Sequence, residues 1–286
     1  MIDQHSADSR PSPVVAPRLG VCSWSLRPES PEALIEALQR LGMASVQLDL
    51  STMISNADAW TKAAAKFRKA GIRIASGMMR MAGEDYATLE TIRATGGVRP
   101  DSTWPQNQQH AAAVAELAQD AQIELVTFHA GYIPEDDSDP EHARIVERLR
   151  GLADVFADHQ VSVAFETGQE TADTLLAALA AIDRSTVGVN FDPANMILYG
   201  TGEPAGALKQ LAPFVRQIHI KDALPAESPG KWGSEVPVGQ GGVDWDEFMA
   251  AANAIRPAVN YIIEREAGEG REHDIAAARD LVSQYV

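Results

Sequence analysis

The chain has 286 residues, 45% of them hydrophobic, which is enough for one large domain with a sizeable core. Its formal net charge is -16 at pH 7, and a field of that sign repels phosphate backbones, which argues against nucleic acid as a partner. With one cysteine, Cys22, the chain can form neither an intramolecular disulfide nor a cysteine-based zinc site.

The first 17 residues are polar and rich in proline, and we expect a flexible N-terminal tail over 1–17 and a single domain over 18–286. The N-terminus lacks the apolar segment of a signal peptide, and no apolar run is long enough to span a bilayer. The sequence therefore predicts a cytoplasmic protein with no membrane partner.

Short apolar segments alternate with longer amphipathic ones along the whole domain, and each of eight strand candidates is followed by a helix candidate. Repeated βα units indicate a parallel sheet, and eight of them predict a closed α/β barrel, the (β/α)8 or TIM barrel. An open doubly wound sheet is the alternative, but no glycine-rich dinucleotide fingerprint follows the first strand. The strand candidates are residues 18–24, 44–50, 72–78, 122–131, 161–168, 186–193, 215–222 and 260–268.

The helix candidates have recognisable ends. Between residues 30 and 42, Ser30 can cap a helix, Pro31 suits its first position and Gly42 can close it. Further helices are expected over 56–71, 142–159 and 171–182.

The segment 78–106 breaks this rhythm. A long connection inside a compact domain is often functional, for example as a lid over an active site. It could equally be a surface excursion that carries one ordinary helix.

Carboxylates and a histidine end four of the late strands. Successive strand residues point to opposite faces, so Glu166, Asp192, His219 and Glu264 should all project into the C-terminal mouth of the barrel, where chemistry sits in this fold. Carboxylates packed together repel one another, and a divalent cation would resolve that repulsion. Carboxylates plus a neutral imidazole suit Mn²⁺, Mg²⁺, Co²⁺, Fe²⁺ or Zn²⁺.

Each of these residues taken alone also has a structural interpretation. Glu166 or Asp192 could cap the following helix, and His219 could be a hydrogen-bonded core histidine. Glu264 could pair with Arg265 or Lys221. It is their shared position at four strand ends that favours one metal site.

The stretches "VAFETG", "VNFDPANMILYGTGEP", "IHIKDA", "VPVGQGGVDW" and "IEREAG" resemble the sugar phosphate isomerase/epimerase family. This family belongs to the xylose isomerase-like TIM barrel superfamily, also known through the AP endonuclease 2-like domain. The resemblance runs from about Arg18 to the end of the chain and implies one divalent metal ion held by Glu, Asp, His and Glu on strands five to eight. These ligands correspond to Glu166, Asp192, His219 and Glu264. Glu266 shares a strand face with Glu264 and is the alternative ligand.

The resemblance further implies a sugar isomerase or epimerase that moves a proton next to a carbonyl through a metal-stabilised enediolate. Glu166 and Glu264 would then serve as base and acid. His129 could orient a hydroxyl or donate a proton, or could make only a structural hydrogen bond. Lys221 could neutralise a substrate oxygen or simply balance the acidic cluster.

Four residues are predicted to contact the substrate. Trp24, which ends the first strand, could stack on a sugar ring or pack in the core. Asn195 stands where many relatives carry histidine, and is expected to bind substrate rather than metal. Gln240, in the "VGQGG" loop, could reach the substrate, or its loop could be only a tight connection. Glu266 is the fourth.

The expected partner is a small sugar or keto-sugar, and a homo-oligomer is possible. Arg80, Lys221 and Lys231 are scattered, so no phosphate pocket is implied. One competing function is a lyase or dehydratase that acts on a keto-sugar, keto-inositol or 3-keto-glycoside with the same metal site. Others are a non-catalytic sugar-binding barrel and a nuclease of the endonuclease IV type, although the latter needs more strand-end histidines than His129 and His219.

Overall fold

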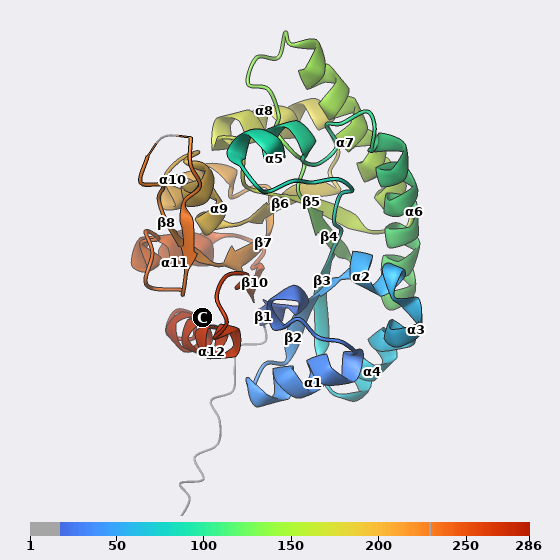
Figure 1. Ribbon diagram of the computed structural model, residues 1–286, viewed down its shortest axis with the longest axis vertical. Coiled ribbons are helices and arrows are strands. Elements are labelled where there is room, and N and C mark those ends of the chain that lie inside the picture. Colours follow the sequence, from blue (N-terminus) through green and yellow to red (C-terminus); the bar gives the residue numbers. More distant parts are fainter. Residues whose placement is uncertain (1–17, 229) are drawn as a thin grey trace, which may run out of the picture.

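The computed structural model describes residues 18–228 and 230–286, so the predicted tail over 1–17 lies outside the described residues. Within the described part, eight parallel strands close into one barrel with helices around it (Figure 1), which confirms the predicted TIM barrel and excludes the open sheet. The barrel order is β1-β10-β7-β6-β5-β4-β3-β2. The strands are β1 (Leu19–Cys22), β2 (Ser45–Asp49), β3 (Arg73–Met78), β4 (Leu125–Phe128), β5 (Ser162–Glu166), β6 (Val187–Phe191), β7 (Val215–Ile220) and β10 (Asn260–Ile263).

Helices connect the strands and cover the outside of the barrel (Figure 1). Among the described residues, no helix combines the length and the apolar character that a bilayer crossing requires. The helices are η1 (Ser23–Leu26), α1 (Pro31–Arg40), α2 (Leu50–Ser55), α3 (Ala57–Trp60), α4 (Ala63–Lys69), α5 (Leu89–Thr95), α6 (Trp104–Ala121), α7 (Pro140–Asp158), α8 (Ala172–Ile182), α9 (Pro193–Tyr199), α10 (Pro204–Leu211), α11 (Trp245–Ala254) and α12 (Arg271–Val282).

The first βα unit forms as its sequence predicts. The Ser30 hydroxyl accepts a hydrogen bond from the Ala33 backbone N–H, and Pro31 begins α1. Gly42 follows the helix with φ +66°, a conformation that glycine adopts without steric cost. Leu34 and Leu38 are fully buried against the barrel.

The prediction of a single helix over 56–71 is wrong. Asp49 ends β2 and caps α2 by accepting from the Thr52 backbone N–H, so the helical region starts earlier than predicted. Lys62 then has φ +57°, which interrupts the run between α3 and α4. The segment 56–71 therefore contains two short helices, α3 and α4, and α2 lies just before it.

The long segment 78–106 carries the short helix α5, and it also forms one side of the cavity described below. Thr88 caps α5 in a reciprocal pair with Thr91. Glu84 accepts from the Gly97 backbone N–H at 3.0 Å, which ties the start of the segment to its later part. The segment is therefore an ordered wall with one helix.

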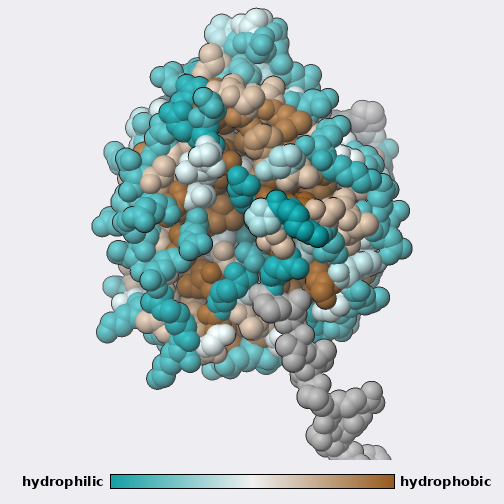
Figure 2. Space-filling model, turned by 180° about the vertical axis from the view of Figure 1, so that it is seen from behind, coloured by the Kyte–Doolittle hydropathy of each residue, from teal (hydrophilic) through white to brown (hydrophobic). Residues whose placement is uncertain are grey.

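The barrel separates apolar and polar side chains by strand face, as the alternating pattern predicts. Outward-facing residues such as Val163, Phe165 and Phe191 are buried beneath the helices. The lumen holds polar side chains instead, among them Gln47 and Gln217, both fully buried. Hydrophilic side chains dominate the outline of the molecule in Figure 2, with hydrophobic areas between them. Among described residues, the large hydrophobic side chains that stay exposed are Tyr86 and Leu224.

Asp222 organises the connection after β7, which contains the short hairpin of β8 (Asp222–Leu224) and β9 (Ser234–Val236). Its fully buried carboxylate accepts from the backbone N–H groups of residues 223, 239, 241 and 243, at 2.9 to 3.2 Å, and from the Trp245 indole at 3.1 Å. A side chain at Gly241 would overlap this carboxylate. The "VGQGG" loop is therefore wrapped tightly around Asp222.

Asp222→Asn should lower the free energy of unfolding by about 1–3 kcal/mol, because an amide turns a donor toward backbone donors and leaves one of them unsatisfied. Glu227→Gln, at an exposed carboxyl in the same hairpin connection, should leave stability unchanged. Urea unfolding of both variants measures the difference, and equal midpoints would contradict this role for Asp222.

Candidate metal centre and active-site cavity

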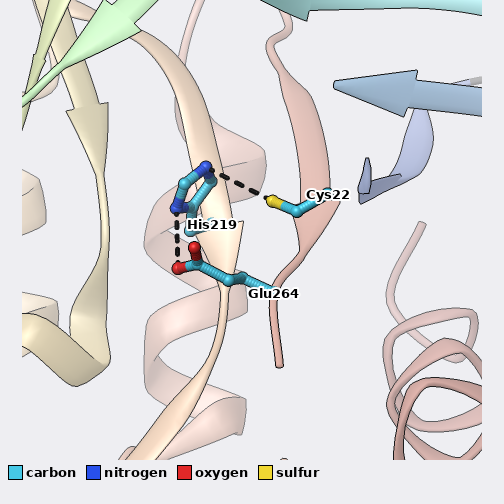
Figure 3. Close-up of side chains that lie close together, drawn as sticks. All are labelled: Cys22, His219 and Glu264. Carbon is cyan, nitrogen blue, oxygen red and sulfur yellow. Dashed lines mark hydrogen bonds and ion pairs between the residues drawn. The ribbon is translucent and has the colours of Figure 1, made fainter. Parts of the chain in front are cut away.

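The structure brings the four strand-end residues into one buried cluster. His219 Nδ1 lies 3.5 Å from Glu166 Oε1, 3.6 Å from Asp192 Oδ2 and 3.3 Å from Glu264 Oε2. One ligand atom from each residue lies within 4.8 Å of the other three. Figure 3 shows one edge of the His219 ring facing Glu264 and the other facing Cys22.

Two atoms of the cluster are buried without a hydrogen-bond partner: His219 Nδ1 and Asp192 Oδ2. Buried polar atoms are normally paired, so two orphaned atoms that face each other need an explanation. A divalent cation between them would satisfy both, and a nitrogen with three carboxylates is a suitable ligand set. The cluster could therefore bind a metal ion.

Asp192 combines the two roles that its sequence position suggested. Its Oδ1 accepts from the Asn195 backbone N–H at 3.0 Å and caps α9, while Oδ2 stays directed at the cluster. Thr167 holds the Asp192 backbone in place through hydrogen bonds at 2.8 and 2.9 Å. Helix capping and a place in the cluster are thus compatible in one carboxylate.

Neighbouring amides hold Glu166 on both oxygens. Asn195 Nδ2 donates to Oε1 at 2.9 Å, and Asn190 Nδ2 donates to Oε2 at 3.1 Å. Asn195 is thus buried beside the cluster and contacts a candidate ligand. His129 Nε2 lies 3.8 Å from Glu166 Oε1, with about a third of its side chain exposed to the cavity.

Glu264, and not Glu266, lies in the cluster. Glu264 accepts from the Trp24 indole N–H at 2.6 Å and from Lys221 Nζ at 3.0 Å. Glu266 also contacts Lys221, at 3.1 Å, but its side chain is 53% exposed. Trp24 therefore orients a candidate ligand in addition to lining the cavity.

Lys221 and Glu264 each stabilise the charged form of the other. Burial acts to raise the pKa of Glu264, but Lys221 and His219 outweigh it and hold that pKa well below its usual value. Burial also opposes the charge of Lys221, but Glu264, Glu266 and Asp192 raise its pKa well above normal. Lys221 is thus an ammonium ion and Glu264 a carboxylate at neutral pH.

Glu166 and His129 shift each other's pKa values. Burial acts to raise the pKa of Glu166, but the imidazoles of His219 and His129 lower it. Burial acts to lower the pKa of His129, but Glu166 and Glu84 raise it above its usual value. Glu166 is therefore ionised at neutral pH, and His129 holds a proton more firmly than a free imidazole does.

The cluster opens into a cavity of about 520 Å³. Of the residues predicted from sequence, Trp24, His129, Glu166, Asn195 and Lys221 line it, as do Glu264 and Glu266. Asp192 and His219 lie beneath it, fully buried.

Gln240 is not brought to this cavity. It is exposed in the loop around Asp222, where its backbone N–H donates to the Pro237 carbonyl. The tight-connection alternative describes this loop correctly.

Sequence reasoning missed most of the outer wall, which combines loop residues with residues at the ends of β2, β3 and β4, in α9 and in β9. Only the unusual length of segment 78–106 pointed to part of it. The remaining lining residues are Asp49, Met78, Met79, Arg80, Glu84, Tyr86, Phe128, Leu198, Tyr199, Trp232 and Glu235.

A protein-family model described as "Xylose isomerase-like TIM barrel" matches residues 35–285. The crystal structure of a xylose isomerase domain protein from Planctomyces limnophilus superposes with a TM-score of 0.83. It is 32% identical, and the match covers 94% of this chain and 96% of that one.

Three further matches carry named activities. A 3-dehydroshikimate dehydratase from Bacillus anthracis is 28% identical over 130 residues, which span 40% of this chain and 46% of that protein. The structure of a probable 3-DHS dehydratase, AsbF, from the same organism has a TM-score of 0.73 at 16% identity, covering 93% of this chain and 98% of that one. D-psicose 3-epimerase from Clostridium cellulolyticum H10 has a TM-score of 0.70 at 16% identity, covering 94% and 99%.

Glu264→Gln should weaken divalent-metal binding at least about 10-fold, because an amide lacks the negative charge that the cluster contributes to a cation. The matched variant Glu266→Gln, two residues further along the same strand end, should bind metal like the wild type. Titration of metal-free protein with Mn²⁺ or Zn²⁺ in competition with a chelator measures both. The opposite ranking would identify Glu266 as the ligand.

Proposed function

The chain belongs to the xylose isomerase-like TIM barrel family, and we propose that it is a divalent-metal-dependent sugar isomerase or epimerase. Its reaction would move a proton on the carbon next to a carbonyl. The observation that carries this proposal is the buried cluster of three carboxylates and one imidazole, two of whose atoms lack partners, at the floor of a cavity.

Glu166, Asp192, His219 and Glu264 would hold the ion, which we propose to be a single Mn²⁺, Mg²⁺, Co²⁺, Fe²⁺ or Zn²⁺. When bound, such an ion supplies positive charge that makes the C–H next to a carbonyl more acidic. The chain's own groups then carry the proton.

Glu166 and Glu264 are the proposed base and acid. Both line the cavity, and their lowered pKa values keep them ionised before substrate binds, so either can act as the base. The one that acts as the acid must first take up a proton, from the substrate or from solvent. Asn195 and Asn190 fix both oxygens of Glu166, while Trp24 and Lys221 fix those of Glu264. Carboxylates held in this way can face a substrate without reorganising first.

The cavity wall supports a sugar as the substrate. Aromatic rings such as Trp24 and Tyr86 offer flat apolar surfaces to the C–H face of a sugar, and charged groups nearby can bind hydroxyls. Lys221 and His129 would contact substrate oxygens. Asn195 and Glu266 are the remaining proposed contacts, whereas Gln240 lies outside the cavity.

A lyase or dehydratase acting on a keto-sugar or related ketone is the second candidate. It is favoured by the sequence match to a 3-dehydroshikimate dehydratase. Such an enzyme shares the removal of a proton next to a carbonyl but then expels a leaving group. His129, whose pKa is raised beside Glu166, could supply the proton that the leaving group needs.

The reaction class can be tested by incubating metal-loaded enzyme in D₂O with a panel of ketoses and keto-sugars. We expect deuterium to enter the carbon next to the carbonyl, and NMR of the product distinguishes an epimer or isomer from an eliminated product. An eliminated product would move the assignment to the lyase. Saturable binding without any deuterium incorporation would favour a sugar-binding barrel.

Glu166→Gln should reduce deuterium incorporation by about 10²-fold or more, because an amide cannot accept the proton. Glu227→Gln, at an exposed carboxyl in the β8–β9 connection, is the matched control and should react at the wild-type rate. A Glu166→Gln variant that incorporates deuterium as fast as the control would remove Glu166 from the proton transfer.

A further inference from the structure

Three buried amide side chains lie in the barrel lumen beside and beneath the candidate metal centre: Gln47 on β2, Asn190 on β6 and Gln217 on β7, here called the amide relay. We propose that Gln47, through this relay, is a positioning residue that fixes the His219 proton on Nε2 and so leaves the Nδ1 lone pair free for the metal. This inference rests on the proposed metal centre and deepens it.

Groups that can only accept hydrogen bonds fix both ends of the relay. At one end, Asn190 Nδ2 donates to the carboxylate Oε2 of Glu166 at 3.1 Å. At the other end, Gln47 Nε2 contacts the Gly77 carbonyl at 3.4 Å and Thr127 Oγ1 at 2.8 Å. Because a carboxylate cannot donate, the Asn190 amide nitrogen must face Glu166. At the other end the Gly77 carbonyl, which also cannot donate, favours the same orientation for the Gln47 nitrogen, and the Thr127 hydroxyl accommodates it.

The hydrogen bonds of Gln217, in the middle of the relay, are consistent with the amide orientations at both ends. Gln217 Nε2 donates to Asn190 Oδ1 at 3.1 Å and to Gln47 Oε1 at 3.0 Å. Its own oxygen accepts from the Ser76 hydroxyl at 2.6 Å. Every amide therefore has one consistent orientation, and the oxygen of Gln47 is the atom that faces His219.

Gln47 Oε1 lies 2.8 Å from His219 Nε2, the shortest contact of that nitrogen. An amide oxygen can only accept, so Nε2 must carry the proton. Asn190 Nδ2 lies 3.1 Å from the same nitrogen, and one of its two hydrogens goes to Glu166. The second could donate to Nε2 only if that nitrogen were unprotonated, which would leave the shorter contact with Gln47 Oε1 without a hydrogen. The Cys22 thiol, 3.6 Å from Gln47 Oε1 and 3.9 Å from Nε2, adds no competing strong acceptor.

Without the acceptor at Gln47, the proton would have a better place on Nδ1. There it would face the carboxylates of Glu166, Asp192 and Glu264, all within 3.6 Å. A proton on Nδ1 occupies the lone pair that a metal ion requires. Gln47 thus decides which edge of the imidazole is a donor and which is a ligand.

Zinc-loaded wild-type protein gives the direct test, because the position of the proton is read on the unaltered protein. In ¹⁵N-histidine-labelled protein with one equivalent of Zn²⁺, a two-bond ¹H–¹⁵N NMR spectrum reports the proton position on each ring, and His219→Ala identifies the His219 signals. We expect a slowly exchanging proton on Nε2 and none on Nδ1. A proton on Nδ1 in the loaded protein would overturn the inference.

Three variants separate positioning from structure. Gln47→Met keeps the length of the side chain but removes the acceptor, and should weaken Zn²⁺ binding about 10–100-fold. Gln47→Glu restores an acceptor toward Nε2 and should bind more tightly than Gln47→Met. Ser45→Ala, at a buried hydroxyl without a partner on the same face of β2, should bind like the wild type.

Chelator competition measures the affinities, and thermal melting of metal-free protein confirms that each variant is folded. Equal affinity of Gln47→Met and wild type would overturn the role of Gln47 while leaving the metal centre intact. If Gln47→Glu bound as weakly as Gln47→Met, the missing acceptor would not be the cause, and the inference would also fall. A wild-type protein that takes up neither Zn²⁺, Mn²⁺ nor Mg²⁺ would instead contradict the metal centre itself, and the role of Gln47 with it.

Discussion

The burial of three carboxylates around one imidazole is the constraint on which the rest of this structure depends. Left uncompensated, such a cluster would cost more than a domain of this size could support. Almost every neighbour is therefore a donor: Asn195 and Asn190 to Glu166, and Trp24 and Lys221 to Glu264. The positions left without a donor converge on one point, and that convergence makes the cluster suitable for a cation rather than merely tolerable in the fold.

The same constraint explains why polar side chains fill the lumen of the barrel while the apolar core lies outside it. The lumen is filled by hydrogen-bonded polar side chains such as Gln47 and Gln217, so little of the apolar core lies inside the barrel at this level. Hydrophobic stabilisation must therefore come mainly from the layer between strands and helices. There the rings of Phe128 and Phe165 pack edge to face, with their centroids 5.3 Å apart. The polar lumen fixes the orientation of the side chains at the site, and the apolar outer layer stabilises the fold.

The sequence alone predicted which side chains of the late strands face the lumen, because this depends only on the two-residue period of a strand and on where the strand ends. Two-residue alternation in the late strands placed Glu166, Asp192 and His219 on the lumen face. Structure that depends on loops or on single backbone conformations was harder to predict: the sequence left Gln240 with two interpretations and did not reveal the left-handed Lys62. The amide relay lies between these cases. Gln217 and Asn190 are two residues before His219 and Asp192, so they share the lumen face, but only the register between β6 and β7, which pairs them, shows that they meet. The metal roles of the cluster remain predictions.

Asp192 joins two parts of the molecule that are otherwise separate. One oxygen caps α9 and the other faces the cluster, and α9 carries Asn195 near its start and Tyr199 at its end, both of which line the cavity. An ion drawn to Asp192 would thereby also anchor the first turn of that helix. By thermodynamic reciprocity, any ligand that prefers the anchored helix must in turn raise the affinity for the ion. Ion binding at the cluster and ordering of α9 beside the cavity would then belong to a single equilibrium, because the Asp192 carboxylate takes part in both.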